Sequence, residues 1–147
     1  MQKQVSVSRE LDGRFQEYRY RTTALVEDIR RIAAARFPQD ALQNAQANLE
    51  VARTIFTKWT LEIMVTLFSL HAVGFEELRR QLKGISPRVL SGRLKTLEAR
   101  NLILRRVLND RPPRVQYRLT NDGLMLARLG EPVFLFLRLR TRSGRTP

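Results

Sequence analysis

The side chains best suited to bind a polyanion lie within residues 86–99. When these residues are placed on a helix, one side carries two cations, a hydroxyl and two very small residues, which are Arg88, Ser91, Gly92, Lys95 and Ala99. The opposite side carries three leucines that are expected to face a core, Leu90, Leu94 and Leu97. Cations and hydroxyls bond to phosphates and base edges, and small residues permit close approach. This surface would fit a DNA major groove, although a solvated helix face has a similar composition.

Gly92 favours the groove interpretation. A glycine inside a helix costs roughly 1 kcal/mol relative to alanine, and close approach to a ligand would explain its presence. Ser86 and Pro87 form the start signal of this helix, a capping side chain followed by proline at the first helical position. Ser86 and Arg93 also count as candidate DNA-binding residues. Arg93 falls on the flank of the helix, where it would serve structure or contact phosphate.

A basic hairpin is predicted directly after this helix. Residues 102–108 and 114–119 have the composition and alternation of strands, and residues 109–113 include paired prolines that cannot continue a ladder. The candidate DNA contacts here are Arg105, Arg111 and Arg114. Arg111 and Arg114 lie at the tip, where arginine would suit a DNA backbone or a narrow minor groove. A solvated outer face is the alternative explanation for Arg105, Arg106 and Arg118.

The charge of the chain supports a polyanionic partner. The 147 residues carry 27 Lys and Arg against 14 Asp and Glu, a net charge of +13. Residues 84–118 alone hold 9 basic and 2 acidic residues, a net of +7. Such a surface suits DNA, RNA or an anionic membrane surface. Genome composition is an alternative source of the arginine surplus elsewhere.

Catalytic chemistry is not indicated. His71 is the single histidine, there is no cysteine, and no paired carboxylates, phosphate loop or nucleophile motif is present. We therefore expect no enzyme activity, no cofactor and no metal site, with His71 as a solvated or capping residue. No apolar run approaches the ~18 residues of a membrane helix, and the first residues do not resemble a secretory signal, so a cytoplasmic protein is expected.

The remaining pattern predicts a mainly α-helical fold with a small β-hairpin. Helices are expected over residues 11–36, 40–54, 58–70, 75–83 and from 121 onwards. Asp40 is expected to cap the start of the second helix and Thr120 the start of the last one. Gly74 is expected to end the helix over 58–70, and Gly84 the helix over 75–83. Pro132 should break or kink the last helix. The order of short helix, second helix, hairpin and helix is that of a winged helix-turn-helix. The expected domains are a helical extension (1–38), a DNA-binding domain (39–123), and a C-terminal helix with a basic tail (124–147).

Two apolar surfaces predict a homodimer. Residues 11–36 repeat in steps of three and four like the seam of a coiled coil, and residues 133–137 form an apolar patch. The proposed dimerisation residues are Phe15, Tyr18, Leu25, Ile29, Ile32, Phe134 and Phe136. Thr22 occupies a seam position and weakens the coiled-coil interpretation. Packing of 11–36 onto its own domain is the alternative.

The stretch from Trp59 to Gly123 resembles the HxlR-type winged helix regulators of bacteria and archaea, relatives of the MarR class. The resemblance depends on Lys-Trp before an apolar helix, on F-x-E-L-R-R-x-L-x-G-I-S-P-R-V-L-S-x-R-L-K-x-L-E at 75–98, on Asn-Leu-Ile, and on P-P-R-V-x-Y-x-L-T-x-x-G at 112–123. It implies a homodimeric regulator that binds double-stranded DNA. Three departures are the missing cysteine that many members use to sense oxidants, Phe56-Thr57 in place of Gly-Gly, and the N-terminal helix.

Other functions remain open at the level of sequence. A non-specific DNA- or RNA-coating protein would have the same charge, and a protein-interaction module could use the same fold. A small-molecule effector is also possible, and Phe56, Trp59, Met64 and Phe68 could line its site between subunits. An aromatic cluster of this kind is more often part of a core.

Overall fold

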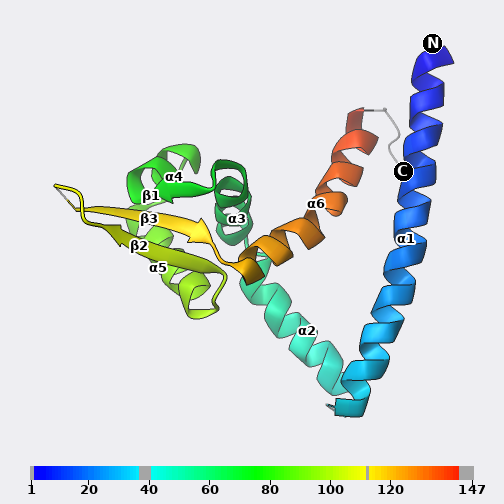
Figure 1. The fold of residues 1–147 in the computed structure, drawn as a ribbon, viewed down its shortest axis with the longest axis horizontal. Coiled ribbons are helices and arrows are strands. Elements are labelled where there is room, and N and C mark those ends of the chain that lie inside the picture. Colours follow the sequence, from blue (N-terminus) through cyan, green and yellow to red (C-terminus); the bar gives the residue numbers. More distant parts are fainter. Residues whose placement is uncertain (1, 37–40, 112, 143–147) are drawn as a thin grey trace. The chain divides into compact units, whose positions relative to one another are not determined.

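The computed structural model describes residues 2–36, 41–111 and 113–142 (Figure 1). Within them the elements follow one another as α1 (Gln2–Arg36), α2 (Ala41–Ile55), α3 (Lys58–Leu70), β1 (Ala72–Gly74), α4 (Phe75–Gln81), α5 (Pro87–Ala99), β2 (Ile103–Leu108), β3 (Arg114–Leu119) and α6 (Asn121–Arg142). The mainly α-helical class is confirmed. The chain divides into two compact units, residues 48–132 and residues 1–47 with 133–147. The three domains expected from sequence stay a prediction.

The core of the unit 48–132 lies between α3, α4, α5 and the sheet. Its most deeply buried side chains are aliphatic residues from each of these elements, namely Ile63, Leu67, Leu78, Leu90, Leu94, Leu97 and Ile103. Leu78 and Leu82 of the α4 region are buried as predicted, and the three leucines of α5 are buried on its inner side. Burial of each such side chain contributes about 1.5–3 kcal/mol, so the core fixes the rotation of α5 about its axis.

The start of α5 follows its sequence signals. Gly84 has φ of 90°, a left-handed backbone that suits glycine, in the turn after α4. The Ser86 hydroxyl then accepts a hydrogen bond from the Val89 N–H at 3.3 Å, and Pro87 takes the first helical position. The predicted helix over 86–99 is confirmed to within one residue.

The sheet has three antiparallel strands in the order β1-β3-β2. The predicted hairpin is confirmed, with Ile103 opposite Leu119 and Leu108 opposite Arg114. Its two strands extend past α4 in Figure 1. Strand β1 was not expected: its Val73 lies opposite Tyr117 of β3. The predicted helix over 58–70 is confirmed as α3, but Gly74 is the wrong stop signal, since the exposed His71, with φ of 67°, is the residue that follows the last helical residue, Leu70.

The end of the hairpin leads directly into α6. The Thr120 hydroxyl accepts a hydrogen bond from the Gly123 N–H at 3.0 Å, which confirms the predicted cap. Of the expected break or kink at Pro132, the break is wrong, since α6 continues through it to Arg142, and the kink stays a prediction. Proline deprives the carbonyl of Arg128 of its helical donor, so the helix continues with one backbone hydrogen bond fewer.

Helix α1 begins at Gln2, nine residues before the predicted start at residue 11. Its seam residues are largely uncovered, with Leu25, Ile29 and Ile32 exposed by 57%, 53% and 68%. Phe15 is half-buried, because its ring packs edge-on against Phe136 of α6 with centroids 5.0 Å apart. The Asp40 cap lies outside the described residues. No helix in the described part of the chain is long and apolar enough to cross a membrane.

Candidate nucleic-acid interface

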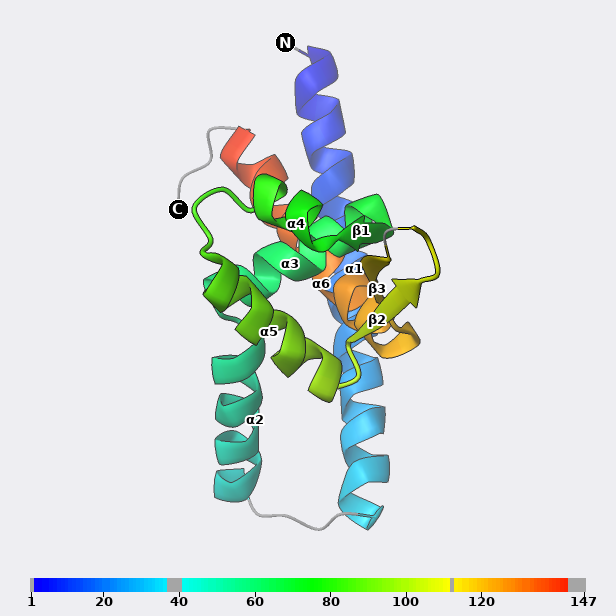
Figure 2. The ribbon, with the colours of Figure 1, turned by 90° about the vertical axis from the view of Figure 1, so that its left-hand side faces the viewer.

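The outer side of α5 carries two exposed cations, and the exposed Glu98 is the one acidic residue of this helix. Arg88, Gly92, Lys95 and Ala99 are exposed, and Ser91 is half-exposed. Neither Arg88 nor Lys95 has an ion pair with any residue that the structure describes. Both cations are therefore available to a ligand. Figure 2 looks towards α5, with the β2–β3 hairpin beside it on the same unit.

The backbone of α5 is open to close approach at Gly92. A Cβ built there would meet no atom within 4 Å, so no neighbour in the fold requires a glycine. The Thr96 hydroxyl donates to the Gly92 carbonyl oxygen at 3.0 Å, which turns that polar side chain back onto its own helix. The helix penalty of Gly92 therefore has no structural compensation within the described residues.

Ser86 and Arg93 do not belong to the outer face of α5. Ser86 uses its hydroxyl to cap α5, although the side chain is exposed. Arg93 is half-buried on the flank, as its angular position predicted. A phosphate beside the start of α5 would meet backbone N–H groups as well as Ser86, because the first helical turn leaves such donors unpaired.

Helix α4 shows a contrasting charge pattern. Arg79 Nε lies 2.9 Å from Glu76 Oε2, and Arg80 pairs with Glu77. The Gln81 amide, which donates to Glu77, and the neighbouring Arg80 guanidinium lower the pKa of the Glu77 carboxyl. The charges of α4 thus neutralise one another, whereas those of α5 do not.

The register of the hairpin separates its arginines between two faces. Arg105 lies opposite Tyr117, on the side that also carries the buried Ile103. Arg106 lies opposite Gln116 and Arg118 opposite Leu104, so both lie on the outer side of the sheet. The sequence-based list of DNA contacts included Arg105 and omitted the other two. The apolar and polar residues of β3 alternate clearly in the sequence, and this alternation could have shown that Arg106 and Arg118 share the outer face of the sheet.

The tip of the hairpin holds Arg111 and Arg114, both exposed. Arg114 Nε lies 3.8 Å from Asp110 Oδ2 in a loose surface pair, while Arg111 has no ion pair with a described residue. An exposed pair of this kind contributes at most about 1 kcal/mol. It can therefore exchange its carboxylate for a phosphate at little cost.

The C-terminal end of α5 is anchored to α2. Arg100 Nη2 donates to Thr54 Oγ1 at 3.1 Å, between positions 46 residues apart in the chain.

Three residues considered for an effector site belong to the core or pack against it, with Met64 buried and Trp59 and Phe68 partly buried. Phe56 is 65% exposed. No described residues form a group of three or more metal-ligating side chains.

Comparison with known proteins agrees with this geometry. The family model described as HxlR-like helix-turn-helix matches residues 54–133. The chain belongs to the HxlR family. It is 39% identical over 75 residues to a protein of Halalkalibacterium halodurans named as an uncharacterized helix-turn-helix transcriptional regulator, a match that spans 50% of this chain and 66% of that relative. YvaP of Bacillus subtilis, also named as an uncharacterized helix-turn-helix transcriptional regulator, is 37% identical over 78 residues, a match that spans 53% of this chain and 72% of that relative.

Solved structures of transcriptional regulators, among them ones named for the MarR family, share the fold. A crystal structure named for a MarR-family regulator from Enterococcus faecalis has a TM-score of 0.56 at 34% identity, covering 72% of this chain and 96% of that chain. The resemblance predicted from sequence is confirmed. The HxlR match begins at residue 54, so it leaves α1 outside the family model.

Proposed function

We propose that this HxlR-family chain is a transcription regulator that binds double-stranded DNA as a homodimer, with α5 in the major groove and the hairpin along the backbone. The observation that carries the proposal is the outer face of α5, where Arg88 and Lys95 are exposed, without an ion pair to a described residue, beside the open backbone at Gly92. Ser91 adds a hydroxyl to this face. These groups can bond to base edges and phosphates from a helix whose rotation is fixed by buried leucines.

The hairpin supplies a second contact of a different kind. Arg111 at the tip and Arg106 and Arg118 on the outer face of the sheet would neutralise phosphates. Phosphate contacts position a protein on DNA and make binding depend on salt, but they carry little sequence information. Specificity is therefore assigned to α5, and general affinity to the hairpin.

Selection of bound duplexes from a random pool, followed by a salt titration on the enriched sequence, tests the proposal. A homodimer should enrich an inverted repeat whose half-sites are about 10 base pairs apart. Affinity for that repeat should exceed the affinity for random duplex on the order of 1,000-fold or more. Equal affinity for all sequences would favour the coating protein, and no affinity at low salt would favour the protein-interaction module.

The double variant Arg88→Ala/Lys95→Ala tests the assignment of α5. If each side chain contacts a base, each should contribute about 1–3 kcal/mol to binding of the enriched site. The matched control is Arg53→Ala/Arg128→Ala, which removes the same charge from exposed positions on α2 and α6 of the same unit. Unchanged specific binding by the first variant would overturn the groove assignment.

Dimerisation through α1 and the end of α6 is part of the proposal. It is supported by the uncovered seam of α1 and by Phe134 of α6, which is 49% exposed. Phe136 contacts Phe15 within one chain and so belongs to the same apolar surface. Residues 1–38 would then assemble the dimer, 39–123 would bind DNA, and 124–147 would support both. A ligand screen by thermal shift tests whether the chain also binds a small-molecule effector.

A further inference from the structure

The exposed side of α1 carries an apolar stripe that needs a partner. Its members are Tyr18, Leu25, Ile29 and Ile32, exposed by 41%, 57%, 53% and 68%. They continue from Phe15 at the spacing of a heptad seam, in which Thr22 is half-buried. The packing of Phe136 on Phe15 covers only one end of this seam within the described residues. Large side chains thus remain open along about four turns of helix.

We propose that this stripe docks against the same stripe of a second copy of the chain, with the two α1 helices antiparallel. The inference deepens the proposed homodimer by giving the orientation and register of its α1 contact. In this register Tyr18 packs beside Ile29 of the partner subunit, and Thr22 beside Leu25 of the partner subunit. The small, polar Thr22 is then always matched with a large aliphatic residue, whereas a parallel pair would place two threonines together.

The flanking charges select the antiparallel orientation. The residues that directly precede Phe15, Thr22 and Ile29 of the seam are Arg14, Arg21 and Asp28. In an antiparallel pair these preceding residues lie beside one another across the dimer. Arg21 then lies beside Asp28 of the partner subunit, and Asp28 beside Arg21 of the partner subunit. In a parallel pair, each of these preceding residues instead faces the residue five positions further along the partner's sequence. Arg14 would then face Arg19 of the partner subunit, twice per dimer. The antiparallel arrangement therefore gains two opposite-charge contacts and avoids two like-charge contacts.

The intrachain pairs of α1 are compatible with these contacts. Arg21 Nη2 lies 2.7 Å from Glu17 Oε1, and Arg31 pairs with Asp28. All four side chains remain exposed, between 44% and 78%. A guanidinium has five N–H donors and a carboxylate about four acceptor sites, so each group can bond to an intrachain and an interchain partner together.

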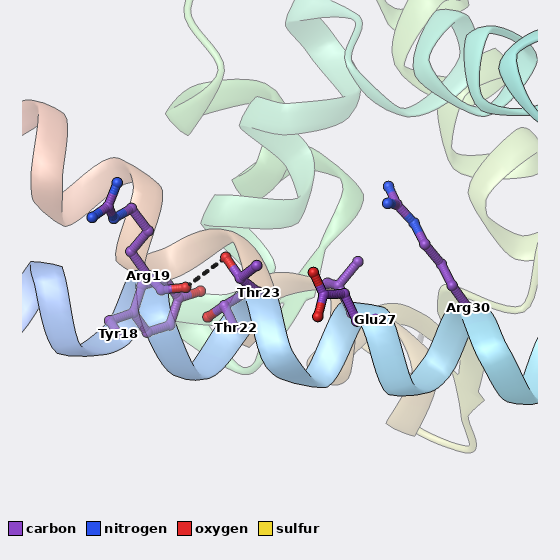
Figure 3. Close-up of a pocket in the computed structure, with 7 residues that line it drawn as sticks. Tyr18, Arg19, Thr22, Thr23, Glu27 and Arg30 are labelled. Carbon is purple, nitrogen blue, oxygen red and sulfur yellow. Dashed lines mark hydrogen bonds between the residues drawn. The ribbon is translucent and has the colours of Figure 1, made fainter.

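The other flank of the seam is different. Tyr18 and Thr22 border a shallow hollow along α1, and Figure 3 shows Arg19, Glu27 and Arg30 rising from the helix on this side. The Thr23 hydroxyl donates to the Arg19 carbonyl oxygen at 2.9 Å. Arg30 has no ion pair with a described residue and lies away from the proposed contact. It therefore offers a control with the same charge on the same helix.

Charge reversal on the full chain, without DNA, tests the pairing by sedimentation equilibrium. Arg21→Glu and Asp28→Arg should each raise the dimer Kd about tenfold, because two attractive contacts become repulsive. The combined variant should recover most of the lost affinity, since the introduced glutamate then faces the introduced arginine across the dimer. Arg30→Glu should leave the Kd within about threefold of the parent, given the small contribution of exposed charges. Failure of the combined variant to recover affinity, at equal helix content by circular dichroism, would overturn the pairing.

Single cysteines test the orientation directly, because the chain has no cysteine of its own. Tyr18→Cys and Ile29→Cys chains with tags of different size are mixed, allowed to exchange and oxidised. An antiparallel pair brings residue 18 beside residue 29 and gives the mixed disulfide. Disulfides between identical chains only, or none at all, would overturn the inference. Since no DNA is present, a mixed disulfide from a chain that binds no duplex would reject the proposed function alone.

Discussion

The hydroxyl of Ser86 accepts a hydrogen bond from the Val89 N–H at 3.3 Å, which places a capping bond at the start of the proposed recognition helix. Ser86→Ala should lower the free energy of unfolding by about 1 kcal/mol, because an N–H of the first turn loses its side-chain partner. Chemical denaturation followed by circular dichroism measures the loss.

Ser86→Asp separates the cap from any contact with DNA. Aspartate caps as well as serine, so stability should stay near that of the parent chain. Its negative charge would repel a nearby phosphate, so affinity for duplex DNA should fall about tenfold at low salt. Parent-like affinity of the aspartate variant would show that no phosphate approaches the start of α5.

Gly123 is a glycine that the fold requires for lack of space. A Cβ at this position would lie 2.0 Å from the Leu102 carbonyl oxygen, which accepts a hydrogen bond from the Thr120 N–H. Gly123→Ala should therefore displace the backbone between β3 and α6 and cost on the order of 3 kcal/mol. A change below about 0.5 kcal/mol in chemical denaturation would show that the junction relaxes freely.

Gly92 should behave in the opposite way. Because a Cβ there meets nothing within 4 Å, Gly92→Ala should stabilise the chain by up to roughly 1 kcal/mol through helix propensity. If DNA approaches this backbone, affinity for the enriched duplex should nevertheless fall, about tenfold or more, through steric conflict.

The matched control for Gly92 is Gly13→Ala on α1, where a Cβ also meets nothing within 4 Å. It should give a comparable gain in stability and leave the affinity for DNA unchanged. If both alanine variants stabilise the chain and both bind DNA like the parent, α5 does not approach the DNA closely at Gly92.

The contrast between these glycines shows what the sequence could and could not predict. The helix start at Ser86-Pro87, the inner leucines of α5 and the Thr120 cap depend on local signals, and each was predicted. Strand β1 has three residues, too few for a period, and forms only because distant β3 offers its edge. The role of Gly123 likewise depends on a carbonyl 21 residues away in the chain, which no local pattern encodes.

The same reasoning applies to the ends of the helices. Residues 2–10 carry little apolar periodicity, so the sequence predicts a later start of α1 than the structure has. Pro132 is a strong breaker signal, yet it lies within α6, where it removes one helical hydrogen bond without ending the helix. On the hairpin, β2 has apolar residues on both faces, and the phase of its arginines becomes clear only from pairing with β3.

The last prediction depends on which face of the sheet each arginine of the hairpin occupies, and it compares three single variants. Arg106 and Arg118 share the outer face of the sheet, whereas Arg105 lies on the face of Tyr117. If the outer face follows the DNA backbone, Arg106→Ala and Arg118→Ala should each weaken binding of specific and random duplexes by similar factors. Each should also reduce the slope of log affinity against log salt by about one, the value for one lost phosphate contact.

Arg105→Ala provides the internal control, since it removes the same charge from the neighbouring position on the other face. It should change the salt slope by less than half as much, through the long-range field alone. Titrations at four or more salt concentrations give the slopes. A larger effect of Arg105→Ala than of Arg106→Ala would mean that the core-side edge of β2, and not the outer face, lies against the backbone.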